Sequence, residues 1–573
     1  MTHPSRTGGQ ILVDALKIHG VDTAFGVPGE SYLDVLDALH DSGIRFIINR
    51  QEGGAAFMAD AYGKMTGQPG ICFVTRGPGA TNASIGVHTA YQDSTPMILF
   101  IGQVGSDFID REAFQEIDYR RMFGQMAKWV AQIDRAERIP EYLARAFQVA
   151  TSGRPGPVVL ALPEDMLTQM AAVADTRRYQ PVQASPSSAQ LDTVRAMLQG
   201  AQRPLLLIGG GGWNAQACAD LQRFAETNDL PVACAFRFQD LLDNAHPNYV
   251  GDVGIGINPK LAARVREADV IVAIGPRLGE MTTGGYALLA APVPAQRLIH
   301  VHADAEELGS VYQAELMINS GMPQFTSMLA AMAPLAGAHR ASWRASVTSA
   351  RAELAAWQQQ PPIFQDGQAP LDLWQVVQDI GRIAPPDVII TNGAGNYATW
   401  AHRFHRYGAM RTQLAPTSGA MGYSVPAGVA AKIIDPQRTV ITFAGDGEYM
   451  MNGQELATAV QYRAGVVVIV FNNGMFGTIR MHQERDYPGR VSGTELHNPD
   501  FAALAVAYGG HGEVVTATAA FGPALERALA WASARQLPAL IELRYDGELI
   551  TPGATLATIR SNALAAKAAQ AAK

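Results

Sequence analysis

Short apolar runs alternate with helix-length amphipathic segments along most of the chain. Aliphatic and β-branched residues fill 45–49, 71–75, 96–102 and 157–162, and Gly/Pro clusters mark the joints between segments. Apolar runs that are bounded by turns and alternate with helices are typical of parallel strands covered on both faces. The pattern therefore predicts an α/β fold made of doubly wound parallel sheets.

Two polar stretches interrupt this alternation and are predicted to be linkers. Residues 174–190 are polar and contain Pro and Ser, and residues 358–370 are rich in Gln and Pro. The predicted domains are 1–170, 190–335 and 370–550, followed by a tail at 551–573.

The two outer domains show a short internal similarity. Residues 154–163 resemble residues 536–545, since each segment has helix-breaking proline or glycine residues followed by a predicted aliphatic strand. This similarity suggests two related α/β domains on either side of a third. The Ala-rich residues 563–573 have high helix propensity but almost no apolar diversity, so we expect a frayed end.

The composition excludes several classes of protein. The chain has 573 residues, of which 48% are hydrophobic and only 17% charged, so it is able to bury large cores. Its net charge of -8 and the lack of a basic stripe argue against a nucleic-acid partner. The apolar runs are too short for a membrane span, and the N-terminus lacks a secretory core. Cys72, Cys218 and Cys234 are scattered, which favours a reducing, cytoplasmic compartment over a disulfide framework.

The strongest chemical signal lies in the third domain. A predicted strand at 439–444 runs into Gly-Asp-Gly at 445–447, and a second predicted strand at 466–471 ends in two asparagines. Parallel sheets place ligands at the carboxyl ends of their strands. Mg²⁺ prefers oxygen ligands and usually takes one or two carboxylates together with phosphate oxygens. Asp446 and Asn473 offer such oxygens, and the glycines let backbone amides approach a diphosphate.

This motif resembles the signature of thiamine-diphosphate enzymes. The resemblance extends over nearly the whole chain and is strongest to acetohydroxyacid (acetolactate) synthase large subunits and their relatives. It implies a pyrimidine-binding first domain, a nucleotide-binding-like central domain and a diphosphate-binding third domain. It also implies thiamine diphosphate and Mg²⁺ as cofactors, with Asp446, Asn473 and the backbone carbonyl of Met475 as metal ligands. The cofactor-binding residues that it implies in the third domain are Gly395, Asn396, Tyr397, Gly419, Met421, Gly445 and Gly447.

The resemblance assigns the proton chemistry to Glu52 in the first domain. Glu52 matches the carboxyl group that hydrogen-bonds the cofactor's pyrimidine ring and so creates its internal base. The apolar spacing after Glu52 predicts a helix that begins near this residue and ends at Gly67. The helix dipole favours a carboxylate in this first turn.

The central domain reads as a nucleotide-binding unit. Residues 204–217 form an aliphatic run, four glycines and a helix-like segment, a pattern that permits close approach of a pyrophosphate. By resemblance, the positions that contact FAD in this family are Arg154, Gly210, Gly211, Arg277 and Asp304. Relatives with this domain bind FAD, another nucleotide or none, and these alternatives remain open.

Several positions bear on the substrates. Phe114, Gln115 and Lys128 match residues of the family's substrate channel, and His88 lies where the relatives tend to carry a small residue. Met281 replaces an arginine that handles the oxoacid carboxylate in the synthases, and a neutral Met cannot replace that cation.

His482 replaces a tryptophan that selects the acceptor in the synthases. Both this replacement and Met281 put acetohydroxyacid specificity in doubt. The acceptor is therefore an aldehyde, a ketone or a different oxoacid, bound by His482 or Gln115.

The resemblance implies decarboxylation of a pyruvate-like 2-oxo acid and carboligation of the product to a carbonyl acceptor. The alternatives are an FAD-linked oxidoreductase of the pyruvate-oxidase type and a simple 2-oxo acid decarboxylase or lyase. A homodimer or homotetramer is expected, because in this family the Glu-bearing domain of one subunit completes the metal-bearing domain of another.

Overall fold

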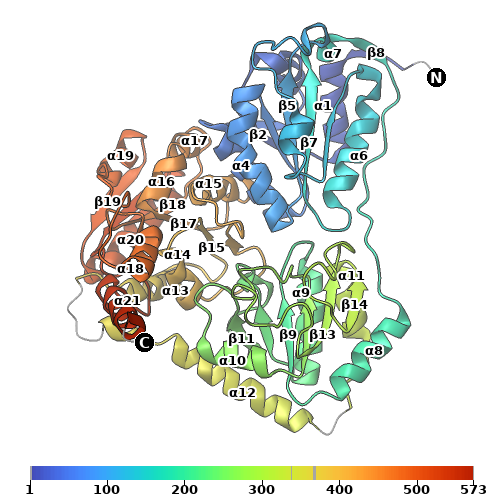
Figure 1. The fold of residues 1–573 in the computed structure, drawn as a ribbon. Coiled ribbons are helices and arrows are strands. Elements are labelled where there is room, and N and C mark those ends of the chain that lie inside the picture. The colour runs from blue at the N-terminus through green and yellow to red at the C-terminus, as the bar shows by residue number, and fades with distance from the viewer. Residues whose placement is uncertain (1–2, 337–338, 365–369, 572–573) are drawn as a thin grey trace.

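The computed structural model describes residues 3–336, 339–364 and 370–571 (Figure 1). Helices and strands form three units, each built on a six-stranded sheet in which every strand pair is parallel. In Figure 1 the first unit is blue to cyan, the central unit is mainly green, and the third unit runs from gold to red. The predicted α/β class with three doubly wound parallel sheets is confirmed.

The first unit has the strand order β3-β2-β4-β5-β7-β6. Its strands are β2 (Thr23–Gly26), β3 (Arg45–Ile48), β4 (Gly70–Val74), β5 (Met97–Gln103), β6 (Trp129–Gln132) and β7 (Pro157–Pro163). Its helices are α1 (Gly8–His19), α2 (Leu33–His40), α3 (Glu52–Thr66), α4 (Gly77–Asp93), α5 (Tyr119–Phe123), α6 (Ile139–Thr151) and α7 (Glu164–Thr168). A short antiparallel pair, β1 (Ser5–Thr7) with β8 (Met170–Ala172), joins the beginning and end of the unit.

The third unit repeats this topology, because its order β16-β15-β17-β18-β20-β19 follows the same sequence of strand positions. Its strands are β15 (Ile389–Asn392), β16 (Gln413–Leu414), β17 (Val440–Gly445), β18 (Val467–Asn472), β19 (His511–Val515) and β20 (Ala539–Arg544). Its helices are α13 (Leu373–Ile383), α14 (Ala398–Phe404), α15 (Ser424–Ile434), α16 (Asp446–Asn452), α17 (Glu455–Gln461), α18 (Gly477–Asp486), α19 (Phe501–Ala507), α20 (Thr518–Arg535) and α21 (Leu556–Ala571). The two segments that look alike in the sequence contain β7 and β20, which occupy equivalent places in the two sheets.

The central unit has a different order, β11-β10-β9-β12-β13-β14, which is the arrangement typical of dinucleotide-binding folds. Its strands are β9 (Pro204–Ile208), β10 (Val232–Cys234), β11 (Tyr249–Asp252), β12 (Val270–Ile274), β13 (Arg297–His302) and β14 (Leu316–Asn319). Its helices are α8 (Ser188–Gln199), α9 (Ala215–Asn228), α10 (Pro259–Glu267) and α11 (Met322–Ala331), and α12 (Arg340–Trp357) follows them.

Helix α3 holds the first and third units together. Its residues from Gly53 to Gly63 are buried, because the helix lies between its own sheet and helix α15 of the third unit. A helix that is enclosed on all sides carries small or apolar residues around its whole circumference. The Phe57 ring of α3 contacts the Tyr423 ring just before α15, with centroids 5.3 Å apart. The two units therefore share one hydrophobic core.

The segments between and after the units differ in character. Residues 174–187 contain no helix or strand, as predicted for a linker. Of the second predicted linker, residues 365–369 lie outside the described residues. The expectation of a frayed tail was wrong over its described part, because α21 continues to Ala571 and Lys567 donates a hydrogen bond to the carbonyl of Asp486, the last residue of α18, at 2.8 Å. None of the helices in the described ranges combines the length and the apolar character that crossing a membrane requires.

Candidate functional site

Two adjacent strands of the third sheet bring the predicted metal ligands together. Strands β17 and β18 are neighbours with Gly445 opposite Phe471, so the residues that follow them emerge at the same edge of the sheet. Asp446, Asn473 and Met475 line one cavity of about 250 Å³ at this edge. Every residue that lines this cavity belongs to the third unit.

Asp446 is a buried carboxylate with several hydrogen-bond donors. The Gly447 amide donates to Oδ1 at 2.9 Å, while the Gly474 amide at 2.8 Å and the Asn498 side chain at 2.9 Å donate to Oδ2. Burial raises the pKa of Asp446, and these donors act in the opposite direction because they stabilise the anion. The donors also fix the orientation of the carboxylate.

This donor set fits Mg²⁺. Asp446 offers a carboxylate, Asn473 an amide oxygen and Met475 a backbone carbonyl, and Mg²⁺ typically completes such a set with phosphate oxygens and water. Within the described ranges, no group of three or more His, Cys, Asp or Glu side chains is arranged to hold a metal ion. This edge of the sheet therefore suits a cation that takes few ligands from the protein better than a cation whose ligands all come from protein side chains.

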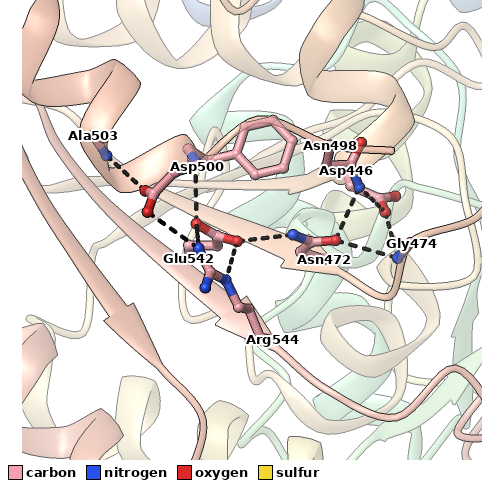
Figure 2. Close-up of polar contacts among 9 residues, drawn as sticks. Asp446, Asn472, Gly474, Asn498, Asp500, Ala503, Glu542 and Arg544 are labelled. Atoms are coloured by element: carbon pink, nitrogen blue, oxygen red, sulfur yellow. Dashed lines mark hydrogen bonds and ion pairs between the residues drawn. The ribbon is translucent and has the colours of Figure 1, made fainter. Parts of the chain in front are cut away.

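A polar network behind the carboxylate was not predicted from the sequence (Figure 2). Asn498 donates to both Asp446 and Asn472, and Asn472 in turn donates to Glu542 Oε1 at 2.8 Å. Glu542 is fully buried in β20 and receives two hydrogen bonds from Arg544, at 2.6 and 3.1 Å. A single acidic residue in an aliphatic strand was the available signal, because an unpaired carboxylate is rarely buried.

A second buried acid, Glu448, was also missed. Its carboxylate accepts hydrogen bonds from Tyr397 Oη, from Ser424 Oγ at 2.7 Å and from the Gly445 amide at 3.3 Å. Burial raises the pKa of Glu448. Glu448 therefore ties together three segments that surround the cavity. Its position three residues after Gly445 in a Gly-x-x-Glu capping pattern was the signal in the sequence.

The other cofactor-binding residues predicted in the third unit meet at this cavity. The residues that line it include Gly395, Asn396, Tyr397, Gly419, Met421, Gly445 and Gly447. The Tyr397 hydroxyl donates a hydrogen bond to Glu448, so the Tyr397 side chain holds part of the cavity wall in place. A Cβ atom at Gly447 would lie 2.4 Å from the Phe476 ring, so a side chain there would displace the ring.

Glu52 lies elsewhere in the chain. It begins helix α3, as predicted, and Gln51 caps the helix by accepting a hydrogen bond from the Gly54 amide. Asn82 donates to Glu52 Oε2 at 2.9 Å. Glu52 is not among the residues that line the cavity with Asp446. The described residues of one chain therefore leave Glu52 outside the cavity that contains Asp446.

The predicted substrate-channel residues of the first unit have different surroundings. Gln115 has a left-handed backbone (φ 66°), and its carbonyl accepts a hydrogen bond from the Gly77 amide at 3.0 Å. Phe114 beside it is 71% exposed. Lys128 donates to the carbonyls of Val149, Ser152 and Arg154, so its ammonium group stabilises the end of α6 and the loop that follows.

A larger cavity of about 930 Å³ joins the third unit to the central unit. It brings together His482 of α18, Met281 of the central unit and His88 of α4, three positions that the sequence linked to the substrate. Gly395 and Gly419 line both this cavity and the smaller one, so the two are adjacent. The buried His482 Nδ1 atom has no hydrogen-bond partner among the described residues.

The glycines of the central unit are explained by packing. A Cβ atom at Gly210 would lie 2.0 Å from the Gly275 carbonyl oxygen, and one at Gly211 would lie 2.3 Å from the Ser94 carbonyl oxygen. The helix that follows is capped by its own Asn214 side chain, which accepts a hydrogen bond from the Ala217 amide. These features account for the glycine run without a ligand, so the run is no argument for a dinucleotide.

The remaining residues predicted to contact FAD form ion pairs or local bonds. Glu307 lies between Arg277, at 3.3 Å, and Arg154, at 3.7 Å. Asp304 accepts a hydrogen bond from the Glu306 amide at 3.0 Å. Arg277, Gly210 and Gly211 line the cavities beside the central unit, and the assignment of FAD stays a prediction.

Three family profiles match the chain in the order of its units. They describe the N-terminal TPP binding domain (residues 6–122), the central domain (residues 191–329) and the C-terminal TPP binding domain (residues 393–543) of thiamine pyrophosphate enzymes. The last of these contains Asp446 and Asn473, and the first contains Glu52.

Characterised proteins are similar over most of the chain. The acetolactate synthase isozyme 2 large subunit of Escherichia coli (strain K12) is 32% identical over 514 residues, which cover 89% of this chain and 91% of the relative. The probable acetolactate synthase large subunit of Methanocaldococcus jannaschii is 32% identical over 519 residues, covering 88% of this chain and 86% of the relative. The acetolactate synthase large subunit of Parasynechococcus marenigrum is 32% identical over 532 residues, covering 89% and 83%.

Proposed function

Because the chain belongs to the thiamine pyrophosphate enzyme family, we propose that it is an acetolactate-synthase-like carboligase. In this proposal it decarboxylates a 2-oxo acid such as pyruvate and joins the remaining carbons to a carbonyl acceptor. The observation that carries the proposal is the convergence of Asp446, Asn473 and Met475 on one cavity, in a chain 32% identical to a synthase over most of its length.

The third unit would hold the diphosphate end of the cofactor through Mg²⁺. Asp446, Asn473 and the Met475 carbonyl are the proposed ligands, and Gly395, Gly419 and Met421 line the same cavity. When bound, thiamine diphosphate supplies a nucleophilic ring carbon and an electron sink for decarboxylation. The chain's own task at this edge is to keep Asp446 ionised and correctly oriented.

Glu52 is the proposed proton-transfer residue. Its carboxyl group would hydrogen-bond the pyrimidine ring and exchange a proton with it, a role that general acid–base catalysis assigns to a positioned carboxyl. The bond from Asn82 at 2.9 Å fixes one of its oxygens. The other oxygen, Oε1, lies beside the Gly79 turn.

We propose that a second copy of the chain completes each site, as a homodimer or a homotetramer of such pairs. This is supported by the separation of Glu52 from the cavity that contains Asp446. Large apolar side chains are exposed in both units, with Ile85 41% and Phe114 71% exposed in the first and Met450 52% and Ile479 54% exposed in the third. Exposed apolar side chains near incomplete sites fit burial against another subunit.

The acceptor would occupy the larger cavity. Met281 gives this cavity an apolar group where the synthases carry an arginine, and His482 lies in the same cavity. At the position of Met281, a carboxylate would lack the bidentate partner that an arginine offers, so we propose an aldehyde, a ketone or a 2-oxo acid bound through His482.

The proposed location is the cytoplasm, and no second function is proposed. All three cysteines are free, and Cys72 and Cys234 are buried, which suits a reducing compartment.

The test of the function is a product assay with pyruvate alone and with pairs of 2-oxo acids and aldehydes. We expect one CO₂ for each carboligation product and dependence on thiamine diphosphate and Mg²⁺. No thiamine-dependent consumption of any 2-oxo acid would refute the proposal. Consumption that requires an electron acceptor would identify an oxidase instead.

A further inference from the structure

Arg237 is a buried cation between the central and third units. It follows β10, is 7% exposed, and lines both the 930 Å³ cavity and a cavity of about 470 Å³ beside the central glycines. Its backbone is left-handed (φ 65°), an uncommon conformation for a residue other than glycine. Such a conformation persists where the surroundings determine it, and it is frequent at functional sites.

The Arg237 guanidinium donates to two carbonyls of the third unit. Nη2 donates to the Gly393 oxygen at 2.7 Å, and Nη1 donates to the Pro416 oxygen. Gly393 comes two residues before Gly395, and Pro416 comes three residues before Gly419. One side chain of the central unit therefore holds the beginnings of both glycine-containing segments that line the cofactor cavity.

The Gly393 peptide is fixed from its other side as well. Its amide donates to the Tyr397 hydroxyl at 3.1 Å, and that hydroxyl donates to the buried Glu448 carboxylate. Glu448 also accepts from Ser424, at the beginning of α15. Arg237 is thus the cationic end of a buried chain whose anionic end is Glu448. Burial lowers the pKa of Arg237, while attraction to nearby groups that include Tyr397, Asp93 and Glu448 acts in the opposite direction.

We propose that Arg237 is a positioning residue that sets the spacing of segments 393–397 and 416–421 before the cofactor binds. The inference rests on the proposed function, since these segments are assigned to thiamine diphosphate. In this role the central unit acts on the cofactor site through one guanidinium. A guanidinium suits the task because its planar fork reaches two carbonyls at once.

Other contacts between the same two units provide a matched control. Asn244 accepts a hydrogen bond from the Tyr407 amide at 3.1 Å, and the Asn244 amide donates to the Tyr407 carbonyl at 2.8 Å. Tyr407 is not among the residues that line the cofactor cavity. Asn244→Ala therefore weakens the boundary between the units and leaves the two segments held by Arg237.

The first experiment is hydrogen–deuterium exchange on the full-length protein without cofactor. In Arg237→Met, we expect the amides of 393–397 and 417–421 to exchange about tenfold faster or more, because a hydrogen bond to a charged group stabilises by about 1.5–3 kcal/mol. In Asn244→Ala these amides should exchange at the wild-type rate. Equal rates in Arg237→Met and wild type would overturn the proposal.

The second experiment is calorimetric titration with thiamine diphosphate and Mg²⁺. We expect affinity about 10- to 100-fold lower in Arg237→Met, and unchanged affinity in Asn244→Ala. Arg237→Lys should show an intermediate loss, since an ammonium keeps the charge without the two-pronged geometry. Full rescue by Lys would show that charge alone matters and would overturn the bridging role.

The two proposals fail in different ways. If the wild-type protein bound no thiamine diphosphate, the proposed function would fail, and the exchange rates would still test the bridge. If the wild type bound it and Arg237→Met bound it equally well, only the inference about Arg237 would fail. Should Arg237→Met not fold, the same two measurements on Arg237→Lys decide the question.

Discussion

The first and third units have the same strand order but different chemistry at equivalent positions. The third strand of one sheet is β4, which is followed by Thr75 and Arg76, whereas the third strand of the other is β17, which is followed by Asp446. Arg76 forms an ion pair with Glu30 at 2.6 Å, while Asp446 faces a cavity. Shared topology thus provides the sheet edge, and individual side chains decide what that edge can bind.

The comparison extends to the helices that follow the second strand of each sheet in chain order, which is β3 in the first unit and β16 in the third. Helix α3 begins with the carboxylate of Glu52, and the equivalent helix α15 begins with Ser424, whose hydroxyl donates to Glu448. The two helices pack against each other. In the proposed function, the first unit carries the proton-transfer group and the third unit carries the metal-binding edge.

The largest expected effect tests this division of labour. We expect Glu52→Gln to lower kcat by about 10²–10⁴-fold, because an amide cannot exchange the proton. Asp446→Ala should also be inactive, because the metal loses its carboxylate. When the two inactive chains are mixed under conditions of subunit exchange, part of the activity should return, since one site of a mixed dimer has both residues.

Activity of the mixture is compared with each variant treated alone. Absence of recovery despite heterodimers detected by native mass spectrometry would show that each site is built within one chain.

Cofactor binding should separate the same two variants. We expect Asp446→Ala to lower the affinity for thiamine diphosphate and Mg²⁺ together by about 100-fold or more, and Glu52→Gln to lower it by only a fewfold. Isothermal titration measures both. Equal losses in the two variants would contradict the assignment of metal binding to the third unit alone.

A smaller effect is expected from the network behind Asp446. Glu542→Gln should lower the affinity for Mg²⁺ and thiamine diphosphate by about tenfold, in line with residues that orient metal ligands. The amide weakens the contact with Arg544 and so loosens Asn472 and Asn498. The control is Glu513→Gln on the adjacent strand β19, where Glu513 pairs with Arg527 away from the cavity. Matching behaviour of the two variants would remove Glu542 from the site.

The smallest expected effect concerns stability and the central unit. Asp252 lines a cavity of about 300 Å³, and burial raises its pKa from 3.8 to about 7. The unfolded chain releases this proton first, so the folded state loses stability as pH rises from about 4 through about 7. Asp252→Asn removes this loss.

The free energy of unfolding of Asp252→Asn minus that of the wild type should therefore increase by up to about 2–3 kcal/mol between pH 5 and pH 8. Thermal unfolding of both proteins at the two pH values measures the change. A constant difference in Tm would contradict a raised pKa for Asp252.

The sequence predicts the local features of the molecule well. Strands β17 and β18 were predicted at 439–444 and 466–471, and each lies within one residue of these bounds. The agreement is close because aliphatic runs and turn residues are local signals. The residues proposed to bind the metal also stand out in the sequence, since they belong to one strand–helix–strand unit and the turn that follows it.

Contacts over long sequence distances could not be predicted in this way. Glu542 reaches Asn472 through strand pairing, and Arg237 reaches Gly393 from another unit, so no spacing in the sequence reveals either contact. The packing at glycines 210 and 211 is hidden from the sequence for a related reason, because the atoms that exclude a side chain there come from Gly275 and Ser94.

The place of β20 within its sheet has a consequence for how the chain matures during synthesis. The first sheet is complete once Pro163 is made, but β20 lies between β18 and β19 and ends at Arg544. At about 5–20 residues per second, the ribosome needs about 20–75 s between these two points. Asp446 is made late in that interval, and Glu542, which supports it through Asn472 and Asn498, is made later still. A nascent chain therefore completes the first unit, with Glu52, well before its own third sheet, so the two parts of the proposed site become available at different times.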